Sequence, residues 1–214
     1  KQSQKFHLIN NTMNLLTQNG KLKETSKKLG LKIFNFSIPA YKTKSGKVTC
    51  PFADACVKYC YAQKGNYTRF PSVGVGMEKR YLATKSITFV PLMDKAIKSK
   101  KLDALRIHDS GDFYSKAYIQ KWFEIANLNP NVNFYAYSKS IPLFKGLELP
   151  KNMDIIFSFG SKKDSLIDTK NDRHAQIFSN EKELKEAGYI NASKIDYYAT
   201  KFYSNNKKVG LIYH

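Results

Sequence analysis

The sequence predicts an α/β protein built as a partial or distorted (β/α) TIM-like barrel with a metal-binding cysteine loop. Two observations predict this class. Short apolar segments rich in β-forming residues alternate with helical segments at βαβ spacing, and polar motifs follow the predicted strands. An open doubly wound sheet shares these features and stays as the alternative. The 214 residues contain no repeat or linker. We interpret residues 1–30 as an arm or short helix and residues 31–214 as one catalytic domain.

The first half of this domain contains a strand, a hairpin turn and two helices. Residues 33–38 alternate as a strand that Pro39 ends, and a glycine-containing turn at 44–49 indicates a hairpin. Residues 74–100 have helical periodicity. We expect Pro91 to divide them into two helices, because proline lacks the amide hydrogen that a helix interior uses.

The second half continues the alternation. Residues 102–108 form a short apolar strand, Ser115 caps a helix with a continuous apolar face, and residues 132–137 and 155–159 are strands. Three shorter elements complete the prediction: a helix at 181–187 and strands at 195–198 and 209–213.

All three cysteines of the chain, Cys50, Cys56 and Cys60, fall in one loop after the first strand. An odd, tight group is a poor disulfide framework and is typical of an intracellular metal or redox site. Three thiolates from one loop suit one face of an iron–sulfur cluster or a zinc ion with a further ligand. We expect a [4Fe–4S] cluster, with zinc as the alternative, and we expect Lys58 to lower the thiol pKa values.

A second polar motif follows the strand at 102–108, where His108, Asp109, Ser110, Gly111 and Asp112 stand in succession. A carboxylate at a strand tip can act as a general base, a nucleophile or a hydrogen-bond acceptor, and glycine permits close approach of a ligand to the backbone. An aspartate-rich turn before a capped helix explains the same residues without function. We take Asp109, Asp112 and His108 as candidate catalytic residues.

Candidates for substrate binding lie at the same strand ends or offer aromatic and cationic groups, which stack on bases and neutralise phosphates. Four segments share these ends: the cysteine loop and residues 109–112, 138–140 and 160–164. The candidates are Ser110, Gly111, Phe113, Tyr61, Lys64, Arg69, Ser138, Lys139, Gly160 and Ser161.

The charge of the chain indicates a polyanionic partner. Lysine and arginine number 36 against 17 aspartate and glutamate residues, which gives a formal net charge of +19. Nucleic acid is the polyanion that such a surplus favours, and a lysine-rich composition without a partner is the alternative. No apolar run approaches the ~18 residues that span a bilayer, so we expect no membrane partner.

Three segments together resemble a phage-encoded family known as gene product 88. They are the cysteine loop with Cys-Tyr-Ala-Gln-Lys-Gly at 60–65, Arg-Ile-His-Asp-Ser-Gly-Asp-Phe-Tyr-Ser at 106–115, and Asn-Phe-Tyr-Ala-Tyr-Ser-Lys-Ser at 133–140. The resemblance covers roughly residues 30–214 and implies a phage protein in the cytoplasm of a bacterial host. That family often carries another cysteine cluster near its end, which residues 192–214 do not contain.

The loop at 109–113 is also similar to the Asp-Ser-Gly-Gly-Phe loop of guanine transglycosylases, whose phage relatives insert 7-deazaguanines into DNA. This resemblance implies that Asp109 contacts the base and that a second aspartate, Asp196 or Asp154, is the nucleophile. Asp112 stands where that loop has glycine. The partners implied are DNA, in preference to RNA, and a free modified base.

Three cysteines after the first strand, with an aromatic residue before the last, look like radical S-adenosylmethionine enzymes. Those enzymes have the spacing C-x3-C-x2-C, whereas this chain has C-x5-C-x3-C, and residues 109–112 occupy the place of their Gly-Gly-Glu loop. The resemblance implies S-adenosylmethionine as a second cofactor.

Three hypotheses follow from the sequence. The preferred one is a DNA-modifying pentosyltransferase that exchanges guanine for a 7-deazaguanine. The second is an iron–sulfur enzyme of the radical type. The third is a basic nucleic-acid-binding protein that holds a structural metal and has no catalytic activity.

Overall fold

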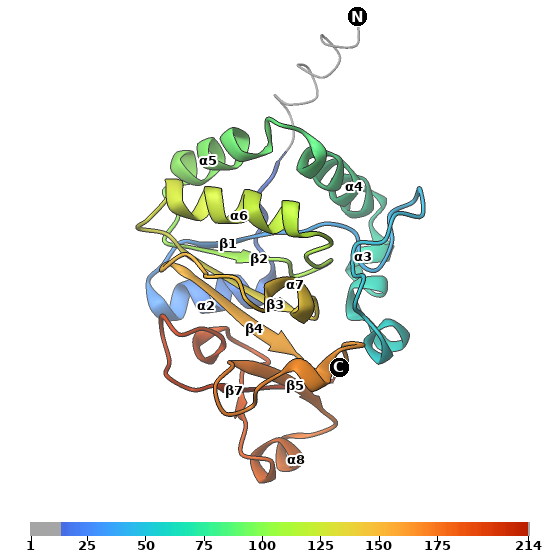
Figure 1. The fold of residues 1–214 in the computed structure, drawn as a ribbon, viewed down its shortest axis with the longest axis vertical. Helices are drawn as coiled ribbons and strands as arrows, with labels where there is room; N and C mark the ends of the chain where they lie inside the picture. Colours follow the sequence, from blue (N-terminus) through green and yellow to red (C-terminus); the bar gives the residue numbers. More distant parts are fainter. Residues whose placement is uncertain (1–13, 214) are drawn as a thin grey trace, which may run out of the picture.

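The computed structural model describes residues 14–213 and has a seven-stranded, all-parallel β-sheet at its centre (Figure 1). The strand order is β1-β2-β3-β4-β5-β7-β6. The strands are β1 (Ile33–Phe36), β2 (Ala104–Ile107), β3 (Asn133–Ser138), β4 (Met153–Ser158), β5 (His174–Phe178), β6 (Ile190–Asn191) and β7 (Lys208–Ile212). Because the strands are parallel, their carboxyl ends share one rim of the sheet, where α/β proteins gather their functional loops.

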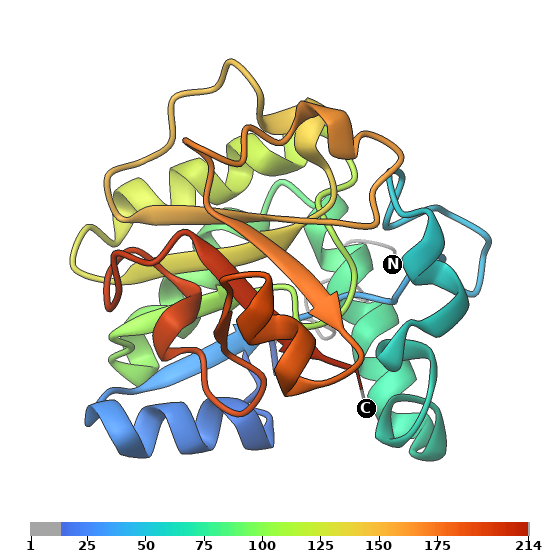
Figure 2. The same ribbon diagram turned by 90° about the horizontal axis from the view of Figure 1, so that it is seen from below.

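The sheet curls into a half-barrel, which confirms the predicted partial barrel (Figure 2). The helices of the outer face are α4 (Pro71–Lys85), α5 (Phe89–Lys100), α6 (Lys116–Leu128) and α7 (Ile141–Phe144). Helix α2 (Gly20–Leu29) packs on the inner face, and α8 (Glu181–Glu186) packs beside β5, β6 and β7. None of the helices in the described part of the chain is long and apolar enough to cross a membrane.

Apolar side chains alternate between the two faces of the sheet. On β2, Leu105 joins the outer core and Ala104 joins the inner core, and both are fully buried. Trp122 of α6 lies at the centre of the outer core, with its ring edge-on to Phe36 at 5.2 Å between centroids. Sheets of this kind are buried on both faces, so a charged side chain in the middle of a strand needs a partner inside the protein. Arg106, which points to the inner face of β2, is such a side chain.

The predicted N-terminal arm is a strand-like segment followed by a helix. Thr17 pairs in antiparallel fashion with Asn35 of β1, and the Asn19 side chain accepts a hydrogen bond from the Leu22 amide at the start of α2. Gly30 ends the helix in the left-handed conformation, which glycine adopts without strain. Leu15 and Leu16, which precede the pairing of Thr17, are buried against the outer core.

The two helices expected between residues 74 and 100 are present, but their boundary was predicted wrongly. Helix α4 ends at Lys85 and α5 begins at Phe89. Pro91 lies in the first turn of α5, where the missing amide hydrogen has no partner in any helix. The break comes instead from residues 86–88, where the Ser86 hydroxyl accepts a hydrogen bond from the Thr88 amide.

The C-terminal third departs most from the prediction. The expected strand at 195–198 is wrong, because Tyr197–Ala199 forms a 3-10 turn and Asp196 is its N-terminal flank. Two strands were not expected, β5 and the two-residue β6. The helix expected at 181–187 and the strand expected at 209–213 are confirmed within a residue as α8 and β7.

Candidate functional site

A cavity of about 170 Å³ lies at the carboxyl rim of the sheet, between the cysteine loop and the loop after β2. Its wall combines the two polar motifs that the sequence singled out, although they are far apart in the chain. The predicted site residues that line it are Cys50, Cys56, Cys60, Tyr61, His108, Asp109, Ser110, Gly111, Asp112 and Lys139. Arg106 of β2 and Tyr137 of β3 also line it, from the inner face.

The cysteine loop is held over the rim by the loop that follows β4. It contains the 3-10 turns Ala55–Tyr59 and Tyr61–Gln63. The Asp54 amide donates to the Gly160 carbonyl at 3.2 Å, and the Lys162 amide donates to the Phe52 carbonyl at 2.9 Å. The positive φ of Gly160, 92°, supplies the turn that these contacts need. Gly160 and Ser161 therefore support the cysteine loop and do not line the cavity.

The three thiols are free and half-buried. The Tyr41 amide donates a hydrogen bond to the Cys50 sulfur at 3.3 Å. Burial, with the nearby charge of Asp112, raises the pKa of the Cys50 thiol to about 12. Burial also raises the pKa of Cys56, although Lys139 acts in the opposite direction. For Cys50 and Cys56 the expectation that Lys58 lowers the pKa is wrong, because burial dominates and the cation that acts on Cys56 is Lys139.

A zinc ion needs ligands that converge on one point. Among these residues, no three histidine, cysteine, aspartate or glutamate side chains are grouped as ligands of one metal ion. The metal predicted at the cysteine loop stays a prediction.

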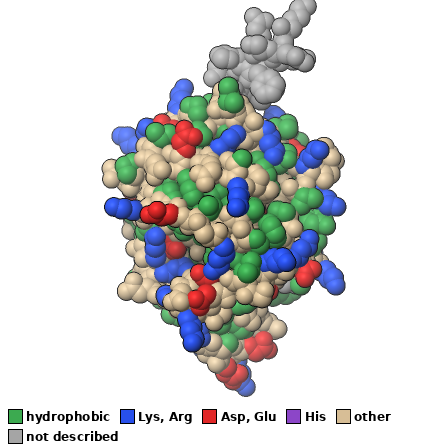
Figure 3. All heavy atoms as spheres, viewed as in Figure 1, with side chains coloured by type: hydrophobic (Ala, Val, Ile, Leu, Met, Phe, Trp, Pro, Cys, Tyr) green, Lys and Arg blue, Asp and Glu red, His purple; other side chains and the backbone are tan. Residues whose placement is uncertain are grey.

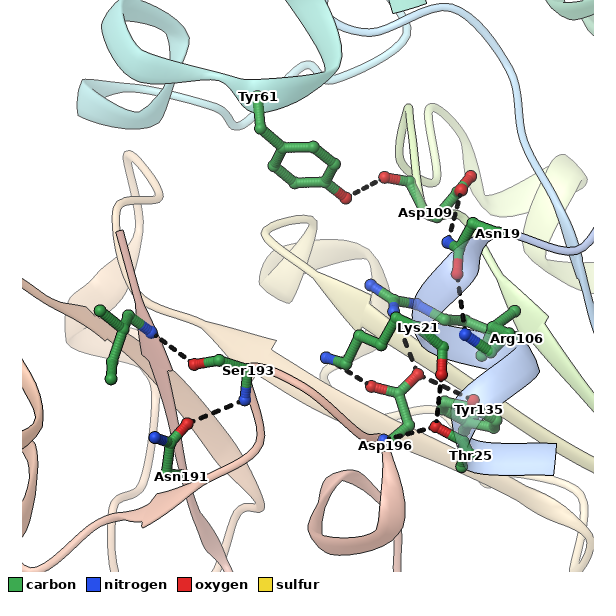
Figure 4. A network of polar contacts seen from close by, with 12 residues as sticks. Asn19, Lys21, Thr25, Tyr61, Arg106, Asp109, Tyr135, Asn191, Ser193 and Asp196 are labelled. Atoms are coloured by element: carbon green, nitrogen blue, oxygen red, sulfur yellow. Dashed lines mark hydrogen bonds and ion pairs between the residues drawn. The ribbon is translucent and has the colours of Figure 1, made fainter. Parts of the chain in front are cut away.

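Asp109 connects the two halves of the site (Figure 4). Its Oδ2 accepts hydrogen bonds from the Asn19 amide group at 3.0 Å and from the Tyr67 hydroxyl at 3.1 Å. The Tyr61 hydroxyl, which comes from the cysteine loop, donates to the Asp109 carbonyl. Asp109 is buried, and its Oδ1 has no hydrogen-bond partner among residues 14–213. One carboxylate oxygen is thus fixed, and the other is a buried acceptor without a donor in the described part of the chain.

Asp112 has a different role, because both of its oxygens are occupied. Its carboxylate accepts hydrogen bonds from the Phe113 amide, the Ser138 hydroxyl at 2.7 Å and the Lys139 amide at 2.8 Å. Burial raises the pKa of Asp112, and these three donors oppose that rise. Asp112 ties the loop after β2 to the loop after β3. Phe113 and Ser138 serve this connection and lie outside the cavity wall.

Gly111 allows the loop after β2 to pass close to β1. Its φ is +82°, and a Cβ built on it would lie 2.3 Å from Cγ1 of Ile38. The Ile38 amide donates to the Ser110 carbonyl beside it. Any side chain at this position would push the loop away from the strand end.

His108 is buried in an aromatic environment. Its Nε2 shares a hydrogen bond of 2.9 Å with the Tyr118 hydroxyl, and its ring packs edge-on against Phe113. Burial lowers the pKa of His108 to about 3, so the imidazole is neutral at neutral pH. A neutral imidazole can accept or donate a hydrogen bond but does not supply a positive charge.

Asp196 belongs to a buried charge network on the inner face of the sheet. Lys21 Nζ lies 2.7 Å from Asp196 Oδ1, and Arg106 Nη1 lies 3.0 Å from Oδ2 (Figure 4). The Tyr135 hydroxyl donates to the same carboxylate at 2.9 Å. Burial alone would raise the pKa of Asp196, but the charges of Arg106 and Lys21 outweigh it and lower the pKa to about 2. Asp196 does not line the cavity.

The remaining predicted residues lie apart from the cavity. Lys64 and Arg69 are exposed, and neither lines it. Asp154 lies at the opposite rim, where it forms an ion pair with Arg173 at 3.2 Å.

Three residues of the site were not expected from the sequence: Asn19, Lys21 and Arg106. A signal for Arg106 was present, because a charged residue inside an apolar strand that is buried on both faces requires a partner. Asn19 and Lys21 belong to α2, and only the tertiary fold brings α2 to the inner face.

Fold and site together define an α/β half-barrel protein whose cysteine loop closes over a polar cavity at the carboxyl rim of its strands. The chain belongs to the gene product 88 family, whose model matches residues 13–213. It is similar to the protein named "Gene 88 protein" of Mycobacterium phage L5, with 34% identity over 105 residues. That match covers 42% of this chain and 43% of the phage L5 protein. No solved structure matches the fold.

Proposed function

We propose that this phage protein is an iron–sulfur enzyme of the radical S-adenosylmethionine type that acts in the cytoplasm of a bacterial host. The observation that carries the proposal is that Cys50, Cys56 and Cys60 line one cavity with Asp109. This cavity lies at the carboxyl rim of an all-parallel half-barrel, and (β/α) enzymes place their chemistry at that rim.

The donor set fits a [4Fe–4S] cluster. Three thiols outside any disulfide face one cavity, and a cluster binds each thiolate through a different iron, so the sulfur atoms need not converge on one point. The amide of Tyr41, which donates to Cys50, is the kind of hydrogen bond that tunes the potential of a cluster. Zinc stays the alternative and would take a fourth ligand.

Cys50, Cys56 and Cys60 would hold the cluster, which would supply, when reduced, the electron that breaks a carbon–sulfur bond of S-adenosylmethionine. The protein residues bind and orient. Asn19 and Tyr67 hold one oxygen of Asp109, which leaves the other to accept a hydrogen bond from an ammonium group. Tyr61 connects the cysteine loop to the Asp109 backbone and so holds the loop beside Asp109.

Base exchange needs a second carboxylate beside the reacting sugar, to act as the nucleophile. Asp196 is engaged by two cations and by Tyr135, and Asp154 lies at the opposite rim. Neither faces the cavity that holds Asp109. For this reason we propose radical chemistry in preference to guanine exchange.

The test is reductive cleavage of S-adenosylmethionine by protein reconstituted with iron and sulfide without oxygen. We expect the wild-type protein, given dithionite, to release methionine and 5′-deoxyadenosine. We expect Cys56→Ser to release neither, and Asp109→Asn to keep its iron and sulfide while its apparent affinity for S-adenosylmethionine falls. A wild-type protein with a complete cluster and no cleavage would contradict the proposal.

Nucleic acid, DNA in preference to RNA, is the partner that we propose for the positive charge. Lysine and arginine side chains are spread over the face drawn in Figure 3. A second cavity, of about 510 Å³, opens at the amino ends of β4, β5 and β7 and contains Lys145, Arg173, Lys201 and Lys207. Phosphates bound there would lie at the opposite rim from the cysteines, so we assign nucleic acid as a bound partner and not as the reacting group.

A further inference from the structure

The inner wall of the cysteine cavity contains two buried hydrogen-bond donors that have no acceptor. Arg106 Nε and the Tyr137 hydroxyl are both buried and have no hydrogen-bond partner among residues 14–213. Both residues line the cavity, and they are neighbours: the Arg106 guanidinium lies 5.0 Å from the centre of the Tyr137 ring. A buried donor without an acceptor costs free energy, so two such donors side by side indicate that something accepts from them.

The Arg106 guanidinium is held through Nη1, which gives Nε a defined direction. Arg106 Nη1 is held by Asp196 at 3.0 Å, and Asp196 is held in turn by Lys21 and Tyr135. The Arg106 residue is 7% exposed. A guanidinium clamped on one edge presents its Nε–H in a single direction, because its donors form a rigid planar fork.

The charged groups around Arg106, on the inner wall of the cavity, favour the binding of an anion. Lys21 and Arg106 carry two positive charges, and Asp196 carries one negative charge. The rim carboxylates, Asp109 and Asp112, follow the end of β2, whereas Arg106 lies inside that strand. The inner wall thus has a net positive charge that favours an anion, whereas the rim combines the two carboxylates with the cation Lys139.

We propose that Arg106 and Tyr137 form an oxyanion-binding site in the half-barrel, which takes a singly charged carboxylate or phosphate group of the substrate. One oxygen accepts from Arg106 Nε and the other from the Tyr137 hydroxyl, in the manner of a two-point carboxylate contact. The assignment of this group to the substrate rests on the proposed function. Oxyanion binding itself does not, because the two donors belong to the protein without its metal.

The first test uses metal-free protein and acetate as the probe. Titration is followed by the rise of the melting temperature and by ¹³C-acetate line broadening, with chloride at equal ionic strength as the reference. We expect acetate to bind saturably and Tyr137→Phe to weaken binding about tenfold, the loss typical of a hydrogen bond to a charged group. Tyr203→Phe is the matched control, because it removes a phenol hydroxyl outside the cavity, and we expect it to bind acetate as the wild-type protein does.

Two results would contradict the proposed oxyanion-binding site. One is a response to acetate that equals the response to chloride, as expected if only water satisfies the two donors. The other is equal acetate affinity in wild-type protein and Tyr137→Phe. Neither result depends on the cluster, so failure here is distinct from failure of the radical chemistry.

A second titration distinguishes an anionic group of the substrate from the carboxylate of S-adenosylmethionine. It repeats the acetate experiment on reconstituted protein saturated with S-adenosylmethionine. If the site belongs to the substrate, acetate binds with unchanged affinity in the presence of S-adenosylmethionine. If S-adenosylmethionine displaces acetate, its own carboxylate occupies the site and the assignment to the substrate is wrong.

Discussion

At the scale of single residues, His108 shows how burial fixes a charge state beside the cavity. The residue is buried among aromatic rings, and burial holds its pKa near 3. It also adopts a positive φ of 64°, a conformation that histidine and asparagine tolerate better than most residues. The imidazole is thus a neutral hydrogen-bonding group at the end of β2, and an acid role for it is unsuited to neutral pH.

His108 predicts how stability depends on pH. The pKa is about 6.5 in the unfolded chain and lower in the folded protein. The stabilising contribution is therefore complete above about pH 6.5 and is lost as the pH falls toward the folded pKa. We expect the free energy of unfolding to fall by about 1.4 kcal/mol per pH unit in this range. Urea unfolding of His108→Asn, which does not titrate, should lack this slope, and an unchanged slope would contradict the account.

Gly111 predicts a local steric effect that a matched glycine isolates. Gly111 and Gly146 have nearly equal φ, +82° and +80°, but only Gly111 faces Ile38. Alanine at either position costs backbone strain, and at Gly111 it also overpacks the loop against β1. We expect Gly111→Ala to lower the free energy of unfolding by about 1–3 kcal/mol more than Gly146→Ala does. Denaturant unfolding measures both variants. If they lose the same free energy of unfolding, the loop after β2 moves aside and the close approach to Ile38 has no cost.

At the scale of elements, α2 connects the inner core to the site. Leu22 packs into the inner core, Lys21 pairs with Asp196, and the cap residue Asn19 binds Asp109. One helix therefore sets the position of both the buried charge network and the candidate ligand-binding carboxylate.

The double role of Asn19 predicts a difference between two helix caps. Asn19 caps α2 and Asn180 caps α8 in the same way, and alanine at either cap costs about 1 kcal/mol. Asn19→Ala also leaves the buried Asp109 carboxylate without one donor, for a further ~1–3 kcal/mol. Thermal or urea unfolding of Asn19→Ala and Asn180→Ala measures the difference. Equal losses would mean that the contact with Asp109 contributes nothing.

The local elements were predictable where hydrophobic periodicity is strong. Helix α6 begins after the Ser115 cap as expected, and β3 follows at Asn133. Asp196 misled the prediction because the apolar and aromatic residues beside it are typical of a strand, whereas its ion pairs with Lys21 and Arg106 hold it in a turn. Strand β5 was not predicted because His174 and Gln176 interrupt its apolar pattern.

The candidate site was predictable in its motifs and not in its geometry. The cysteine loop and the loop after β2 were expected at one rim, since parallel strands share their carboxyl ends, and they line one cavity. Apart from the resemblance to guanine transglycosylases, the sequence does not distinguish Asp109 from Asp112, because their roles depend on donors from Asn19, Tyr67 and Ser138. Those donors reach the loop only through tertiary packing.

At the scale of the whole molecule, the half-barrel separates two kinds of surface. The carboxyl rim contains the three thiols and Asp109 around a small cavity. The amino ends of β4, β5 and β7 surround a larger cavity with four cationic side chains. Asp172 and Asp154 pair with Lys145 and Arg173 in the larger cavity, so Lys201 and Lys207 are the cations that we propose for phosphates.

The net charge of +19 predicts binding to nucleic acid with strong salt dependence. Each phosphate contact contributes about −0.9 to the slope of log affinity against log salt. We expect Lys201→Gln, in the larger cavity, to reduce the slope for a DNA duplex by about one contact. Lys98→Gln, which removes an exposed lysine paired with Asp94, is the control and should not change it. Fluorescence anisotropy at several salt concentrations measures the slope for each variant. If Lys201→Gln and Lys98→Gln have the same slope, the larger cavity does not contact the phosphates of DNA.

The whole proposal depends on whether the three cysteines hold one iron–sulfur cluster at the carboxyl rim. Iron, sulfide and zinc analysis of protein purified without oxygen, with electron paramagnetic resonance after reduction, tests it most directly. The account predicts about four iron and four sulfide atoms per chain and a cluster signal that is lost in Cys50→Ser, Cys56→Ser and Cys60→Ser. Stoichiometric zinc without sulfide, or a cluster signal that survives any one of these substitutions, would contradict it.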